Sequence, residues 1–68
     1  MNAYELTETF KRDFPNTMLK RGSLIAIFEL WKYEDTHVML ANLGFLEAIG
    51  IITVGEAVKI RDLAEGAK

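Results

Sequence analysis

The sequence predicts an all-α protein: a small bundle of four or five short helices around a central apolar helix. Three observations support this fold class. Apolar residues recur at helical spacing along most of the chain. Two of the predicted helices start with capping signals. One segment, Thr36–Gly50, is apolar on almost every side when it is wound as a helix. Residues 1–68 are predicted to form a single helical domain, because no repeat, linker or low-complexity segment divides them.

The first predicted helix spans Met1–Phe14. Asn2 can cap its first turn, and Glu5, three residues later, can complete a capping box. The helix is expected to stop at Phe14, because the residue before a proline is pushed toward extended geometry. Pro15–Gly22 is predicted to be a connector, and Ser23 is the predicted N-cap of the next helix.

Ser23–Glu34 is the segment for which a strand competes with a helix. Its aromatic and β-branched residues suit a strand. A strand here has two apolar faces, and the chain has little material to cover both. A helix places four apolar residues at positions i, i+3, i+4 and i+7, and is the preferred interpretation. These residues are Leu24, Ile27, Phe28 and Trp31.

Thr36–Gly50 is the predicted centre of the bundle. A helix with apolar side chains on three sides has to be wrapped by other elements or by another chain. Asp35 or Thr36 can cap its start. Gly50 can end it, because glycine accepts a left-handed conformation at low cost.

The last predicted helix, Val54–Glu65, has the clearest local start signal. Thr53 and Glu56 form a second capping box, T-x-x-E. Together with Thr36–Gly50 this helix is a candidate helix-turn-helix, whose second member enters the major groove of DNA. Its exposed residues are more acidic than basic, which opposes contact with phosphates. A plain αα-hairpin is therefore the preferred interpretation.

Size and composition predict help from a second chain. A domain of this length buries only about 60% of the surface that it exposes when unfolded. Small domains therefore use disulfides, a metal or oligomerisation to reinforce the core. The chain has no cysteine and one histidine, and half of its residues are apolar even before glycine is counted. The expected state is a homodimer, or a chain that completes its core on a protein partner.

Charge and hydropathy disfavour several classes of partner. A net charge of −2 gives the whole chain no attraction to nucleic acid or to an anionic membrane. No apolar run approaches the roughly 20 residues that span a bilayer. No signal peptide is visible. The lack of cysteine fits a reducing compartment. The expected location is the cytoplasm, either of the parent cell or of a host.

No group of residues predicts catalysis. His37 lies near Glu34 and Asp35, and Ser23 is the only serine, but no strained turn or oxyanion hole accompanies them. His37 is predicted to be a surface residue in a first helical turn. A single histidine without cysteine makes a metal site improbable, and there is no glycine-rich phosphate loop. We expect a protein that is not an enzyme and holds no metal or cofactor.

Four residues are candidates for contact with a protein partner: Trp31, Tyr33, Gly44 and Phe45. Trp and Tyr are enriched at binding hot spots, although Trp31 also fits the core. Glycine inside a helix costs about 1 kcal/mol relative to alanine. Close approach of another helix, from the same chain or a second one, is a reason to keep Gly44. Phe45 lies on the apolar surface of the same predicted helix.

A candidate basic patch lies around the end of the first helix and the connector. It consists of Lys11, Arg12, Lys20 and Arg21. A chain reversal at Pro15 can bring the four charges together against nucleic acid or an acidic protein. The alternative is an ordinary solvated surface, balanced by nearby acidic residues. Four charges without exposed aromatic residues between them make a weak nucleic-acid footprint, so this alternative is preferred.

The predicted function is a small non-enzymatic protein–protein interaction module. It is expected to be an accessory, inhibitor or adaptor protein, of the kind that viruses and mobile elements encode, that binds a larger protein assembly. The alternative is a helix-turn-helix transcriptional regulator that reads DNA with Val54–Glu65. The acidic charge and the lack of a chemical motif favour the first function.

Overall fold

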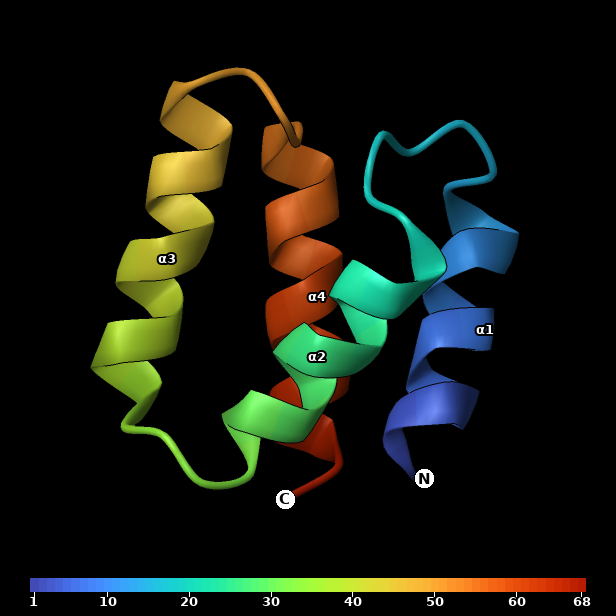
Figure 1. Ribbon diagram of the computed structural model, residues 1–68, viewed down its shortest axis with the longest axis vertical. Helices are drawn as coiled ribbons and strands as arrows, with labels where there is room; N and C mark the ends of the chain where they lie inside the picture. Colours follow the sequence, from blue (N-terminus) through green and yellow to red (C-terminus); the bar gives the residue numbers. More distant parts are fainter.

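The computed structural model describes all 68 residues, which form four α-helices and no strand (Figure 1). The helices are α1 (Ala3–Asp13), α2 (Arg21–Trp31), α3 (Thr36–Ala48) and α4 (Val54–Gly66). The Cα radius of gyration is 10.7 Å, close to the value of about 11 Å expected for a collapsed chain of this length. None of the helices is both long enough and apolar enough to cross a membrane. The predicted all-α bundle is confirmed.

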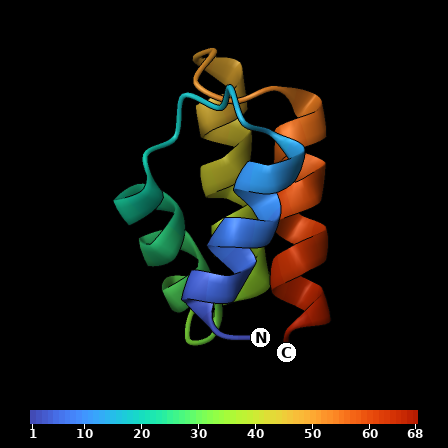
Figure 2. The same cartoon turned by 90° about the vertical axis from the view of Figure 1, so that its right-hand side faces the viewer.

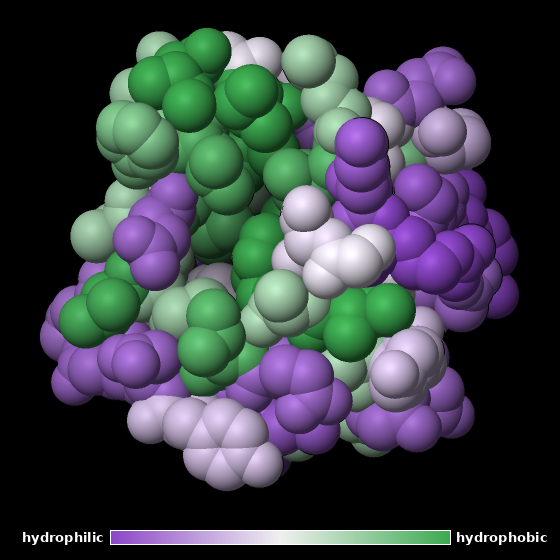
Figure 3. Space-filling model, in the orientation of Figure 1, coloured by the Kyte–Doolittle hydropathy of each residue, from purple (hydrophilic) through white to green (hydrophobic).

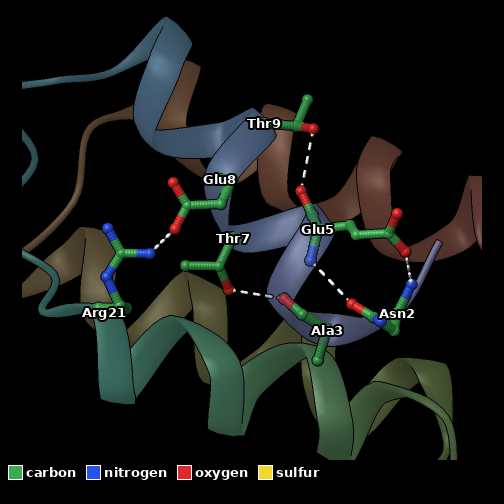
Figure 4. A network of polar contacts seen from close by, with 7 residues as sticks. All are labelled: Asn2, Ala3, Glu5, Thr7, Glu8, Thr9 and Arg21. Atoms are coloured by element: carbon green, nitrogen blue, oxygen red, sulfur yellow. Dashed lines mark hydrogen bonds and ion pairs between the residues drawn. The ribbon is translucent and has the colours of Figure 1, made fainter.

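The two predicted capping boxes are present. In α1, the Asn2 side chain accepts the Glu5 N–H at 2.9 Å, and the Glu5 carboxylate accepts the Asn2 N–H at 2.9 Å (Figure 4). In α4, Glu56 accepts the Thr53 N–H at 2.9 Å and donates its own N–H to the Thr53 hydroxyl at 3.1 Å. The first helix also ends as predicted, because Phe14 has left the helical region at φ −129° and ψ 69°.

The start of α2 differs from the prediction. The helix begins at Arg21 after an extended Lys20, so Ser23 lies inside the first turn and is not the N-cap. No side chain caps this end. Instead, the Arg21 guanidinium pairs with Glu8 of α1 (Figure 4). The start of α2 is therefore held by a contact with another helix, which the residues next to it in the sequence do not predict.

The preferred helical interpretation of the second segment is confirmed, although α2 is shorter than predicted. It buries Leu24, Phe28 and Trp31, which are spaced as one helical stripe. The helix ends at Trp31 and not at Glu34. The chain turns there, because two successive N–H groups after Lys32 donate to the Leu30 carbonyl.

The core lies among α1, α2 and α4, with α3 at the edge of the bundle (Figures 1 and 2). The structure therefore corrects the predicted position of Thr36–Gly50, because only Met39 and Leu43 of α3 are buried. The centre is filled by larger side chains, among them Phe10 and Trp31, each at most 1% exposed. The fourth helix, α3, contributes Met39 and Leu43 to this core from one side and is not wrapped by the others.

The α3–α4 hairpin is built by local signals at each of its ends. Asp35 caps α3, since its carboxylate accepts the His37 N–H at 2.7 Å. Gly50 ends that helix at φ +82°, as predicted. Ile52 then enters the core at 4% exposure. The two helices run side by side in opposite directions (Figures 1 and 2), whereas the helices of a helix-turn-helix cross at about 90–120°.

Candidate functional site

Large apolar side chains remain exposed along the α3–α4 hairpin. On α3, Phe45 is 63% exposed, Ile49 53% and Val38 46%; on α4, Val54 is 63% and Val58 40% exposed. Figure 3 shows hydrophobic side chains gathered over the upper part of α3, whereas the opposite side of the molecule, over α1, is mostly hydrophilic. Contiguous apolar surface of this kind marks interaction sites on soluble proteins.

The exposed apolar residues of α3 lie opposite to its core contacts. Met39 and Leu43 point into the bundle. Four other residues of α3 recur at spacings of three and four along the opposite side, and all four are exposed. We call them the outer seam: Val38, Ala41, Phe45 and Ala48. The helix therefore has one apolar side that the chain uses and a second that it leaves uncovered.

A pocket of about 190 Å³ lies beside the outer seam, between α3 and α4. Gly44 belongs to its wall, together with apolar residues of both helices; Glu47 and Arg61 are its charged members. We call this pocket the Gly44 groove. A Cβ atom at Gly44 would meet no atom of another residue within 4 Å. Nothing inside the chain therefore requires glycine at this position.

The structure separates the four predicted partner-contact residues. Trp31 is 1% exposed and belongs to the core, so no partner reaches it. Tyr33 is 83% exposed, in the turn after α2. Gly44 and Phe45 lie together on the exposed surface of α3. Val38, Ala41 and Ala48 of the outer seam were not among the predicted contact residues, although their heptad spacing relative to Phe45 is a signal that identifies them.

The predicted basic patch is a surface of mixed charge. Arg21 pairs with Glu8 of α1 (Figure 4), and Glu8 lies one helical turn before Lys11 and Arg12. Lys20 precedes Arg21 and is exposed. The chain reversal thus brings Arg21 close to the basic end of α1, but an acidic residue stands between them. The arrangement favours the interpretation as a solvated surface.

The largest pocket, about 410 Å³, lies where the α1–α2 connector meets the start of α4. Glu56 lines it and is 6% exposed. Its Oε1 accepts the Thr53 N–H, whereas Oε2 is buried without a hydrogen-bond partner. Burial raises the pKa of Glu56, but nearby polar groups of Thr17 and Thr53 hold that pKa below its ordinary 4.5. Oε2 has no exposed surface, so a ligand in this pocket cannot reach it, and the carboxylate serves the helix cap.

The side chains of Ser23, Asp35 and His37 share no hydrogen bond. The Asp35 carboxylate accepts the backbone N–H of His37, and no hydrogen bond joins it to the imidazole. Ser23 is exposed in the first turn of α2. No group of three or more His, Asp or Glu side chains lies close enough together to hold a metal ion.

Comparison with known proteins adds no relative. No protein-family model, no curated protein and no solved structure matches the chain. Function is therefore inferred from the geometry of the chain itself. The outer seam and the Gly44 groove bring exposed apolar residues together beside a pocket on one helical hairpin.

Proposed function

We propose that this protein is a non-enzymatic protein–protein interaction module. It acts in the cytoplasm as a small accessory, inhibitor or adaptor protein that docks on a larger assembly. The outer seam of α3 and the adjoining Gly44 groove form its docking surface. The observation that supports this function is a helix with two apolar sides, one of which packs in its own core while the other leaves Phe45 63% exposed.

The docking surface combines one exposed aromatic side chain with an apolar hollow. Phe45 offers a large aromatic contact that loses little conformational entropy on binding, and the groove beside it offers an apolar hollow. The exposed fractions of the five large side chains of the hairpin together equal about two and a half fully exposed apolar side chains. At about 1.5–3 kcal/mol for each fully buried side chain, covering them contributes about 4–8 kcal/mol. The partner's own apolar surface adds to this gain, and together they oppose the entropy cost of association.

The geometry of α4 does not favour the alternative function of DNA recognition. Lys59 pairs with Asp13 at 2.8 Å, and Arg61 pairs with Asp62 at 3.1 Å. Both basic residues are thus neutralised by neighbouring carboxylates, and little free positive charge is left for phosphate contacts. The hairpin arrangement of α3 and α4 points the same way.

Affinity capture with matched variants tests the proposed function. The wild-type chain is compared with Phe45→Glu and with Tyr4→Glu, a control on α1 whose side chain is exposed to nearly the same extent, 65%. Each variant is first checked for helical content by circular dichroism. A partner is expected to be captured from the native cell by the wild type and the control, and lost with Phe45→Glu. The purified partner should then bind with the same preference in a calorimetric titration. Equal capture by all three proteins would contradict the proposal.

A further inference from the structure

We infer that a second copy of this chain covers the outer seam, with the two α3 helices packed in parallel about a two-fold axis. This inference rests on the proposed function, because it names a partner of the same surface, and a second copy bound there competes with the larger assembly for it. Four features of α3 and its surroundings support it: the heptad spacing of the seam, the size of the hole that faces Phe45, the absence of acidic residues from the positions that flank the seam, and the area that a dimer needs.

The outer seam has the spacing of a coiled-coil interface. Val38 and Phe45 are seven residues apart, and so are Ala41 and Ala48. The two pairs occupy the a and d positions of a heptad, which is the pattern by which one helix packs along another. Each of the four residues is exposed. All four a and d positions of the seam are therefore apolar, and the rest of the chain leaves them exposed.

Three of the four residues that form the hole facing Phe45 are small. In a parallel pair, an a-position side chain inserts among four residues of the facing helix. For Phe45 these are Ala41, Gly44, Phe45 and Ala48 of the second copy. The Gly44 groove, of about 190 Å³, adjoins this hole, and a cavity of about 150 Å³ is enough to hold a benzene ring. A phenyl ring packed there accounts for a glycine that no contact within the chain explains.

The direction of the pair follows from the two flanks of the seam. Phe45 lies on one flank, whereas Gly44 and its groove lie on the other. A two-fold axis along α3 sets the Phe45 flank of each copy against the groove flank of the other. An antiparallel two-fold pair sets like flanks together and leaves both grooves empty. The parallel arrangement is the one that fills them.

Self-association meets no electrostatic opposition at this seam. The positions that flank it are occupied by His37, Asn42, Gly44 and Ile49, none of which is acidic. The charged residues that line the Gly44 groove, Glu47 and Arg61, have opposite signs. A two-fold contact also needs only one apolar face per chain, and the large apolar residues exposed elsewhere are scattered over other elements.

The available area suits a dimer. A standard interface buries about 800 Å² on each partner, roughly a fifth of the 4212 Å² of this chain. One whole side of the molecule is needed. We expect the outer seam and the exposed apolar residues of α4 to provide it, because α3 lies at the margin of the bundle (Figures 1 and 2).

Single-cysteine variants test the inference, because the chain contains no cysteine of its own. Ala41→Cys places one thiol at a d position, where the two copies face each other within the Cα separation of about 4.4–6.8 Å that a disulfide requires. Met18→Cys, at a residue 69% exposed in the α1–α2 connector, is the control. In a glutathione redox buffer, Ala41→Cys should form the disulfide-linked dimer at least about tenfold faster than the control, because pairing raises the local thiol concentration toward millimolar.

Two further measurements decide between outcomes. In sedimentation experiments at micromolar concentrations, the wild type and Tyr4→Glu should be dimers and Phe45→Glu a monomer. If the wild type stays monomeric, the inference is overturned, but the proposed function fails only if Phe45→Glu also captures the same proteins as the wild type. An antiparallel pair sets a positions against d positions, Val38 against Ala48 and Ala41 against Phe45. Fast crosslinking only in a mixture of Val38→Cys and Ala48→Cys would therefore likewise overturn the parallel arrangement.

Discussion

Replacing Gly44 by alanine should have opposite effects on two quantities. It should raise the stability of the isolated chain and lower the affinity of the docking surface for its partner. Inside the isolated chain, the new Cβ meets no atom within 4 Å, and the position does not have positive φ. The substitution should therefore recover the helix propensity that glycine forfeits, about 0.5–1 kcal/mol. In a domain of this size, 1 kcal/mol shifts Tm by about 4–8 °C. We expect Tm to rise by about 2–8 °C in dilute solution.

The same methyl group should weaken association. It occupies the hole that faces Phe45 in the inferred dimer, so the affinity of one copy for the other falls. A dimer has a Tm that rises with protein concentration by mass action. In Gly44→Ala this concentration dependence should shrink, even though Tm in dilute solution is higher than in the wild type.

Thermal unfolding followed by circular dichroism at several protein concentrations measures both effects. Gly22→Ala is the matched control, because Gly22 is also helical, exposed and free of neighbours within 4 Å of an added Cβ. It should raise Tm slightly and leave the concentration dependence unchanged. A lower Tm for Gly44→Ala in dilute solution would refute the reasoning about open space at α3. If the concentration dependence of Tm is the same in Gly44→Ala as in the wild type, Gly44 does not lie in the contact between the two copies.

Other predictions concern the core, the hairpin turn, pH and DNA. Trp31→Ala should lower the free energy of unfolding by about 3–5 kcal/mol in urea titrations, since the side chain is 1% exposed; a loss below about 1 kcal/mol would contradict its place in the core. Gly50→Ala should cost about 1–2 kcal/mol, opposite in sign to Gly44→Ala, because φ is +82° there. The pKa of Glu56 lies below 4.5 in the folded chain, so its ionised form stabilises the fold above that pH and this contribution is lost as pH falls through the folded pKa. Glu56→Gln should therefore flatten the acid loss of stability in urea titrations across that range, and an unchanged slope would dismiss the carboxylate as its source. Retention on duplex DNA should lack a steep salt dependence; a steep one abolished by Lys59→Ala and Arg61→Ala would revive the transcriptional regulator.

Features that depend on neighbouring residues were predictable from the sequence. The capping boxes of Asn2 with Glu5 and of Thr53 with Glu56 each join groups three residues apart, so their chemistry is complete within one turn. Gly50 is predictable for the same reason, because the left-handed turn is a property of one residue. The start of α2 was not predictable in this way, because Arg21 pairs with Glu8 of another helix.

The sequence by itself determined four helices, their capping boxes and the presence of more apolar surface than one short chain readily hides. Only the tertiary structure decided which apolar side is hidden. Helical periodicity shows that α3 has several apolar sides, but it does not rank them against the sides of other helices that compete for the same core. Trp31 and the other buried aromatic residues fill the core, and Phe45 remains exposed on the surface. Burial is a property of the whole packed set of helices, so the docking surface became visible only when all four were in place.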